Sequence, residues 1–190
     1  AEAFGRGTRG LVTAYGGQAI GLSGMDGNLI RARKMWAYKK GKEGQEKERI
    51  DLGMVGEVET INPEVIRTFM ANKWTPVIAP VGAGPGGEVY NINADLVAGK
   101  VASSLGAEKF ILLTDVEGVL DSQKRLISTM DAKIAARYTQ EGTISGGMIP
   151  KVRCCLEALR EGVKKTHIID GRVKHAILLE IFTDEGIGTQ

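Results

Sequence analysis

The sequence contains little cysteine and little histidine. Its two cysteines, Cys154 and Cys155, are adjacent, so they cannot build a framework of disulfide bonds, and they lack the spacing of metal ligands. His167 and His175 are too few and too isolated for a zinc site. These shortages exclude a disulfide-stabilised secreted domain and a zinc-centred protein, and they predict a reducing compartment.

Long apolar runs and an excess of one charge are also missing. No run approaches the roughly 18 apolar residues of a membrane span, and no secretory signal is visible. The 25 basic and 23 acidic side chains leave a net charge of +2, which gives no footprint for nucleic acid or an anionic membrane. We therefore expect no nucleic acid and no membrane as partners. The expected location is cytoplasmic, or the plastid stroma if the source is a photosynthetic eukaryote.

The sequence does contain an alternation of strand and helix patterns. Its 190 residues, of which 43% are apolar, can bury a sizeable core. The alternation predicts an α/β fold, a three-layer αβα sandwich with a mainly parallel open sheet. The expected helices cover residues 63–72, 94–105, 131–140 and 150–161, and the expected strands cover 19–22, 29–35, 55–61, 76–81, 109–114 and 166–169.

Two connections carry recognisable signals. The segment Ser23–Asn28 contains an Asp-Gly step, which favours the positive φ of a tight turn and predicts a hairpin between strands 19–22 and 29–35. The segment Lys39–Arg49 is basic but interleaved with glutamates. It therefore indicates a solvated loop or hairpin tip, and not a binding patch.

Three polar clusters stand where a strand pattern meets a helical one, which is where open α/β sheets place their ligands. The first, Asn91-Ile92-Asn93-Ala94-Asp95, lies at the entry of helix 94–105. Asn93 alone accounts for a helix N-cap, whereas the three polar side chains together exceed what a cap needs. They suggest an amide for a substrate carboxylate and an acid that orients ammonium groups.

The second cluster, Thr114-Asp115-Val116-Glu117-Gly118, directly follows strand 109–114. It fits either a plain turn or a shelf for the adenine and ribose of a nucleotide. The third cluster, Ser145-Gly146-Gly147-Met148, precedes a helix that has Lys151 in its first turn. A lysine there opposes the helix dipole by about 0.3 to 1 kcal/mol, so a bound phosphate explains it better than stability does. The order of residues is not that of a Walker motif, and Gly82–Gly87 does not fit a nicotinamide fingerprint.

Four segments together resemble the amino acid kinase family: Gly21–Gly27, Asn91–Asp95, Leu113–Leu120 and Gly146–Lys151. They are most similar to the branch that phosphorylates N-acetyl-L-glutamate, and the similarity runs essentially end to end. The resemblance implies a carbamate kinase-like fold. It also implies transfer of the ATP γ-phosphoryl group to the side-chain carboxylate of N-acetyl-L-glutamate, giving an acyl phosphate for arginine or ornithine synthesis.

The resemblance also assigns roles. Residues 1–90 would form the remainder of the substrate-binding and dimerisation lobe, and residues 91–190 the nucleotide-binding lobe. Mg²⁺ would be carried mainly by the phosphates, so no protein residue is assigned to a metal. Asp95 and Lys151 would be catalytic, Asn91 and Asn93 would bind the substrate, and the nucleotide-binding residues would be Thr114, Asp115, Val116, Gly118, Leu120, Gly146, Gly147 and Met148.

One part of the family pattern is not found here. The initial strand with its lysine and glycine pair, the second glycine-rich loop and the substrate-binding arginine are absent from these residues. The chain therefore resembles the carboxyl-terminal two-thirds of such an enzyme. We expect these residues alone to bind nucleotide weakly and to catalyse poorly.

The resemblance extends to regulation and to partners. His175 and the closing segment resemble the site for inhibitory arginine in the hexameric branch of the family, with His175, Glu185 and Gly188 as contacts; a surface helix and an end strand are the alternative. The resemblance implies a homo-oligomer, dimeric or hexameric, and leaves open a PII signalling protein as partner. An aspartate, glutamate or carbamate kinase and a non-catalytic arginine or nucleotide sensor remain alternative functions.

Overall fold

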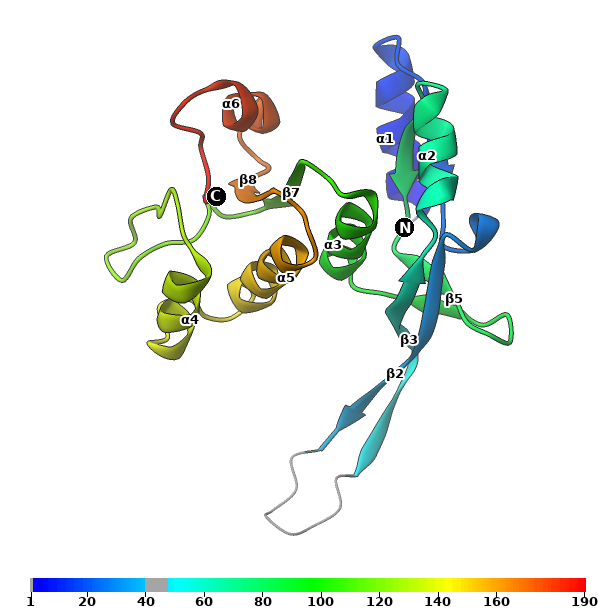
Figure 1. The fold of residues 1–190 in the computed structure, drawn as a ribbon, viewed down its shortest axis with the longest axis horizontal. Coiled ribbons are helices and arrows are strands. Elements are labelled where there is room, and N and C mark those ends of the chain that lie inside the picture. Colours follow the sequence, from blue (N-terminus) through cyan, green and yellow to red (C-terminus); the bar gives the residue numbers. More distant parts are fainter. Residues whose placement is uncertain (1, 40–47) are drawn as a thin grey trace. The chain divides into compact units, whose positions relative to one another are not determined.

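The structure is a computed structural model that describes residues 2–39 and 48–190. The chain divides into two compact units, residues 1–104 and 105–190, and helices and strands alternate in both (Figure 1). The predicted α/β class is confirmed. The predicted tip of the Lys39–Arg49 segment lies mostly outside the described residues. The division into a substrate lobe and a nucleotide lobe at residue 90 stays a prediction.

The first unit begins with a parallel pair of strands flanked by helices. Strand β1 (Ala19–Leu22) pairs in parallel with β4 (Thr75–Ile78). Helix α1 (Glu2–Ala14) contacts both strands, and α2 (Pro63–Ala71) contacts β4 (Figure 1). Helix α2 begins as predicted, since the Asn62 side chain accepts a hydrogen bond from the backbone N–H of Glu64 at 3.3 Å.

The other strands of this unit form a closed arrangement in the order β2-β3-β6-β5. Strands β2 (Ile30–Tyr38) and β3 (Arg49–Ile61) form a long antiparallel hairpin that projects in Figure 1. Strands β5 (Val81–Ala83) and β6 (Val89–Asn91) close it. Ile30, Ala32, Tyr90 and Ile92 are buried there and form its core.

The hairpin predicted between residues 19–22 and 29–35 is wrong. Strand β1 pairs with β4 and strand β2 pairs with β3, so the two segments belong to different sheets. The Asp-Gly step lies in a short 3₁₀ helix, Asp26–Asn28, where Gly27 has a φ of 58°. The Asp26 carboxylate accepts the Ser23 backbone N–H at 2.6 Å, which closes a local turn without strand pairing.

The second unit contains a parallel strand pair covered by helices. Strands β7 (Lys109–Thr114) and β8 (Lys165–Asp170) pair in register along their whole length. Helix α5 (Met148–Arg160) contacts both strands, α6 (Ala176–Phe182) contacts β8, and α4 (Ala132–Gln140) contacts α5 (Figure 1). Phe110, Leu112, Val152, Ala158, Ile168 and Ile169 form the buried core between these elements.

Most predicted boundaries hold to within a few residues. The bounds of α3 (Ala94–Leu105), which Gly106 was predicted to end, and of β7, predicted from its apolar run, are those observed. The predicted strand 76–81 is divided between β4 and β5. Pro80 lies between them and cannot donate to a ladder, although its carbonyl accepts the Ile92 N–H at 3.0 Å. Helix α1 is not among the predicted elements. Among the residues that the structure describes, no helix is both long enough and apolar enough to cross a membrane.

Candidate functional site

The Asn91–Asp95 cluster bridges the end of β6 and the first turn of α3. The Asn93 side chain accepts the Leu96 backbone N–H at 3.2 Å, so Asn93 is the helix cap that the sequence suggested. Asn91 is exposed at the end of β6, and Asp95 is half-buried in the first turn of α3. Buried Ile92 anchors the segment between these polar residues. The cap thus accounts for Asn93, while Asn91 and Asp95 exceed what capping of α3 needs.

The glycine-rich segment Gly21–Gly27 lies beside this cluster within the first unit. The Gly24 backbone N–H donates to the carbonyl of Val81 at 2.7 Å, and Val81 is the register partner of Asn91. A Cβ on Gly24 would come within 2.1 Å of the Val81 carbonyl oxygen, so only glycine allows this approach. Two segments that the sequence analysis treated separately therefore meet at Val81.

The Thr114–Glu117 segment leaves the carboxyl end of β7, as predicted. Thr114 is half-buried and its hydroxyl donates to the Asp115 carboxylate at 3.3 Å, whereas Asp115 and Val116 are exposed. The parallel strand β8 ends at the same edge, because Thr114 and Asp170 are register partners. An edge of this kind can receive a nucleoside.

Gly118 and Leu120 continue this segment into a tight loop. Leu120 forms an antiparallel bridge with Leu126, and the Val119 N–H donates to the hydroxyl of Thr189 at 2.8 Å. Gly118 is buried with a φ of 152°, and a Cβ there would lie 2.7 Å from both Leu126 and Thr189. Packing against Thr189 is thus a reason for glycine at this position that the sequence did not reveal.

Replacing Gly118 by alanine is expected to destabilise the protein by about 1 to 3 kcal/mol, since the new methyl group overpacks a buried contact. Gly142→Ala is the matched control, because Gly142 also has a positive φ, 77°, but has nothing within 4 Å of a Cβ. Thermal unfolding of both variants compares a positive-φ glycine that lacks room for a Cβ with one that has room. Equal losses of Tm in the two variants would contradict the packing explanation.

The glycines before α5 form its amino-terminal turn. Gly146 has a φ of 55°, and Gly147 occupies the N-cap position without a side-chain hydrogen bond to the helix. The first turn contains no acidic residue but does contain Lys151, which is half-buried, and Met148, also half-buried. A helix start with a glycine cap and a lysine is the arrangement expected for binding an anion, such as a phosphate group.

Asp170 and Arg172 are site candidates that the sequence analysis missed. The Asp170 carboxylate accepts hydrogen bonds from the Arg172 backbone N–H at 2.9 Å, from Nε at 2.9 Å and from Nη2 at 2.8 Å. The Arg172 side-chain and backbone hydrogen bonds lower the pKa of Asp170 to about 2. A carboxylate directly after a predicted parallel strand pointed to Asp115 after strand 109–114. The same signal after strand 166–169 could have identified Asp170.

His167 and Glu180 form a second missed pair, inside the second unit. Both side chains are almost fully buried, and His167 Nδ1 lies 2.7 Å from Glu180 Oε1. The other carboxylate oxygen, Oε2, accepts the N–H groups of Ile187 at 2.7 Å and Gly188 at 3.1 Å. Burial opposes ionisation of Glu180, but these hydrogen bonds outweigh it and lower its pKa. No sequence pattern pairs residues 13 positions apart on a strand and a later helix.

The three predicted arginine contacts lie in the second unit but in different settings. His175 is exposed at the start of α6, in a left-handed conformation with a φ of 62°, and Glu185 is exposed after that helix. Gly188 is buried, and a Cβ there would lie 2.3 Å from the Ile168 carbonyl oxygen. The role of these residues in arginine binding stays a prediction.

Metal ligands do not gather in the described part of the chain. Within residues 2–39 and 48–190, no group of at least three His, Cys, Asp or Glu side chains could hold a metal ion.

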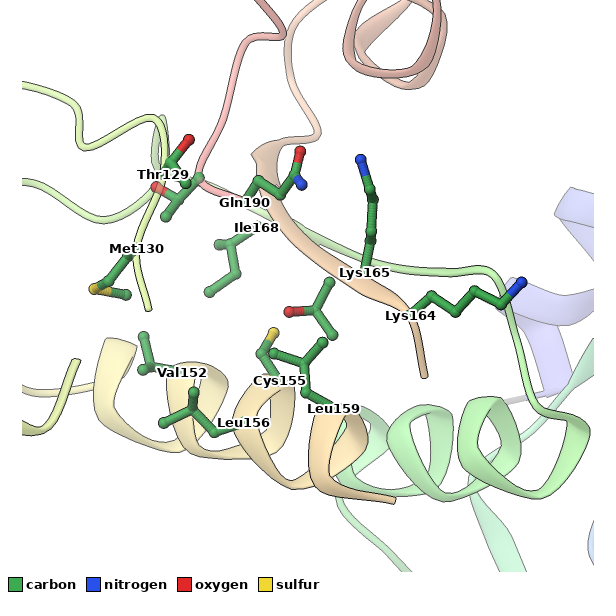
Figure 2. A pocket seen from close by; sticks show the side chains of 12 residues that line it. Thr129, Met130, Val152, Cys155, Leu156, Leu159, Lys164, Lys165, Ile168 and Gln190 are labelled. Carbon is green, nitrogen blue, oxygen red and sulfur yellow. The ribbon is translucent and has the colours of Figure 1, made fainter. Parts of the chain in front are cut away.

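A cavity of about 190 Å³ lies in the second unit between α5 and β8. Its apolar wall comes from Met130, Val152, Cys155, Leu156 and Leu159, with Gln190 at its edge (Figure 2). None of the predicted nucleotide-binding residues lines it. The cavity is therefore separate from the strand edge and from the amino-terminal turn of α5 described above.

A sequence model of the amino acid kinase family matches residues 4–170. The chain is similar to an acetylglutamate kinase from Syntrophus aciditrophicus (strain SB), with 56% identity over 181 residues, which are 95% of this chain and 61% of that protein. The chain thus spans about three fifths of the length of the curated relatives that it matches.

Solved structures show the same fold. N-acetylglutamate synthase from Neisseria gonorrhoeae, complexed with coenzyme A and L-arginine, matches 91% of this chain and 37% of its own, with a TM-score of 0.74 and 25% identity. Carbamate kinase from Giardia lamblia, bound to AMP-PNP, matches 97% of this chain and 69% of its own, with a TM-score of 0.63 and 16% identity. The predicted carbamate kinase-like fold is confirmed.

Proposed function

Because this chain belongs to the amino acid kinase family, we propose that the protein transfers the γ-phosphoryl group of ATP to the side-chain carboxylate of N-acetyl-L-glutamate, a step of arginine biosynthesis. The observation that carries the proposal is the 56% identity with an acetylglutamate kinase over 95% of the chain. The family model, which matches residues 4–170, spans both candidate site regions, the Asn91–Asp95 cluster and the start of α5.

The reaction requires positioning and charge neutralisation, and no covalent intermediate with the protein. A carboxylate oxygen of the acceptor attacks the γ-phosphorus, the bond from that phosphorus to the bridging β,γ-oxygen breaks, and ADP leaves with the electron pair. The product is an acyl phosphate. Two anions must approach each other, so the protein has to supply cationic and N–H groups around the transferring group.

The described residues offer such groups in both units. We assign Asn91 and Asn93 to the acceptor, with the amide of Asn91 toward its α-carboxylate. Asp95 would orient ammonium groups, and Lys151, at the amino-terminal turn of α5, would neutralise the transferring phosphoryl group. On the nucleotide side, the segment after β7 would hold the adenosine with Thr114, Asp115, Val116, Gly118 and Leu120, and Gly146, Gly147 and Met148 would lie along the phosphates.

The protein would use Mg²⁺, which the ATP phosphates would mainly hold. It would be cytoplasmic and would assemble as a homo-oligomer. Arginine would inhibit through His175, Glu185 and Gly188, which is supported by the resemblance of this segment to arginine-sensitive members and by the L-arginine in the similar synthase structure. The resemblance to the family also suggests a PII signalling protein as partner.

The test is a hydroxylamine-trapped acyl-phosphate assay on the product of the complete coding sequence, with ATP and Mg²⁺. We expect product with N-acetyl-L-glutamate and none with glutamate, aspartate or carbamate, because the acceptor site is proposed to recognise the acetylated amino acid. Adding arginine to the same assay tests the inhibition.

Each other outcome has a definite meaning. Product with a different acceptor would reject N-acetyl-L-glutamate and retain phosphoryl transfer. No product with any acceptor, from protein that is folded by circular dichroism, would reject the kinase and favour a sensor of arginine or nucleotide.

A further inference from the structure

Two strands of the second unit end side by side at the edge assigned to adenosine. Thr114 at the end of β7 and Asp170 at the end of β8 are register partners, and the next N–H, that of Gly171, donates to the Thr114 carbonyl at 2.8 Å. A Cβ on Gly171 would be only 3.2 Å from that of Leu113, so this turn lies directly against β7. The chain after β8 is therefore fixed to the start of the Thr114–Glu117 segment.

This turn holds one cation in a defined orientation. Asp170 is buried, with 8% of its side chain exposed, and it binds Arg172 through Nε at 2.9 Å and through Nη2 at 2.8 Å. A two-point contact between a guanidinium and a carboxylate fixes the plane of the guanidinium. The Arg172 side chain is itself 66% exposed. One part of the guanidinium is thus held from within the fold, while much of the side chain remains open to solvent.

Two further carboxylates follow the end of β7. Asp115 comes directly after Thr114, the register partner of Asp170, and both Asp115 and Glu117 are exposed. Besides the larger effect of Asp170, their negative charges raise the pKa of Arg172. Both belong to the segment that is assigned to adenosine. A single cation among three carboxylates leaves an excess of negative charge. This edge therefore disfavours a phosphate group and suits the neutral hydroxyl and amino groups of a nucleoside.

We propose that Arg172, oriented by Asp170, is a positioning residue that fixes the Thr114–Glu117 segment for binding of the nucleoside part of a nucleotide. Without the guanidinium, the turn whose Gly171 N–H donates to Thr114 would lose the two-point contact that holds it, and the negative charges of Asp115 and Glu117 would lose a nearby positive charge. The inference rests on the proposed nucleotide-dependent function and adds to it a residue that acts on the segment and not on the phosphates.

The test compares two ligands that share phosphates but differ in the nucleoside. Calorimetric titration of the complete protein with ADP and with inorganic tripolyphosphate is carried out for the wild type and for Arg172→Gln. We expect the affinity for ADP to fall about tenfold, which corresponds to losing one charge-assisted interaction. The affinity for tripolyphosphate is expected to stay within about twofold, because the phosphates bind elsewhere.

Three variants make the result specific. Arg172→Lys keeps the charge but not the two-point geometry, so it is expected to recover only part of the ADP affinity. Asp170→Asn weakens the hold on Arg172 and is expected to reproduce the selective loss. Arg67→Gln removes an exposed arginine ion pair of the first unit, with Glu64 in α2, and is expected to leave both affinities unchanged.

The outcomes separate this inference from the proposed function. Unchanged ADP affinity in Arg172→Gln, or an equal loss for ADP and tripolyphosphate, would overturn the positioning role while wild-type binding keeps the function intact. A wild-type protein that binds neither ligand would reject the proposed function, and the inference with it.

Discussion

Replacing Lys151 by methionine is expected to lower the kcat for acyl-phosphate formation about a thousandfold, because it removes a cation that stabilises the charge on the transferring phosphoryl group. Methionine keeps the length of the side chain and its packing in the first turn of α5, while the ammonium group is lost. The change also removes a charge that opposes the helix dipole at the start of α5. Steady-state kinetics with ATP and N-acetyl-L-glutamate measure the effect.

The ratio of kinetic constants identifies the role of Lys151. A group that acts in the transition state lowers kcat and kcat/KM together, whereas a group that only binds ATP raises KM and leaves kcat unchanged. Lys133→Met, at an exposed position of α4, is the matched control and is expected to retain wild-type kinetics. A kcat of Lys151→Met within a few-fold of the wild type would refute the assignment of this lysine.

Replacing Glu180 by alanine is expected to cost about 3 kcal/mol of folding free energy, since it leaves buried partners without an acceptor. These partners are His167 and the N–H groups of Ile187 and Gly188. The segment that contains Ile187 and Gly188 continues to Thr189, which pairs with β8 and whose hydroxyl accepts the Val119 N–H. By thermal unfolding we expect a loss of Tm of about 10 °C.

The same carboxylate predicts the direction of a pH effect. The pKa of Glu180 is lowered by folding from an ordinary value of 4.5. Its contribution to stability is therefore complete above pH 4.5 and is lost as the pH falls through the folded-state pKa. Glu180→Gln keeps the shape and one acceptor oxygen but cannot titrate. The fall in Tm on acidification should be less steep in this variant than in the wild type.

Glu157→Ala is the matched control for the alanine variant. Glu157 forms an exposed ion pair with Arg153 at 2.9 Å, and such pairs contribute about 0 to 1 kcal/mol. A similar Tm loss for Glu157→Ala and Glu180→Ala would contradict the importance that we assign to the buried pair.

Part of the candidate site was predictable because its signals are local. Asn93 caps α3, Thr114 ends β7 and the glycines precede α5 at the predicted positions, since caps, strand ends and glycine turns depend on residues within one or two turns of chain. Asp170 ends β8 in the same way that Thr114 ends β7. Its two-point contact with Arg172 remained hidden because side-chain geometry has no sequence pattern.

The buried pair and the sheets required contacts over long sequence distances. His167 and Glu180 meet only because α6 packs on β8, and a histidine and a glutamate with this separation carry no signal of their own. Likewise, the Asp-Gly step predicts a positive φ, which Gly27 has, but it cannot say which strand pairs with which. Strand partners are chosen by the burial of entire faces, and a local turn preference of this kind is easily overridden.

The sequence by itself thus determined the α/β class, the starts of α2 and α3, the strand β7 and the polar clusters that resemble those of amino acid kinases. These follow from apolar periodicity and from capping, which involve neighbouring residues. Only the tertiary structure decided that β1 pairs with β4, that Gly118 packs against Thr189, and that Arg172 is held by Asp170 beside the segment after β7. These are contacts between distant parts of the chain, and their free energy exists only when both partners are packed together.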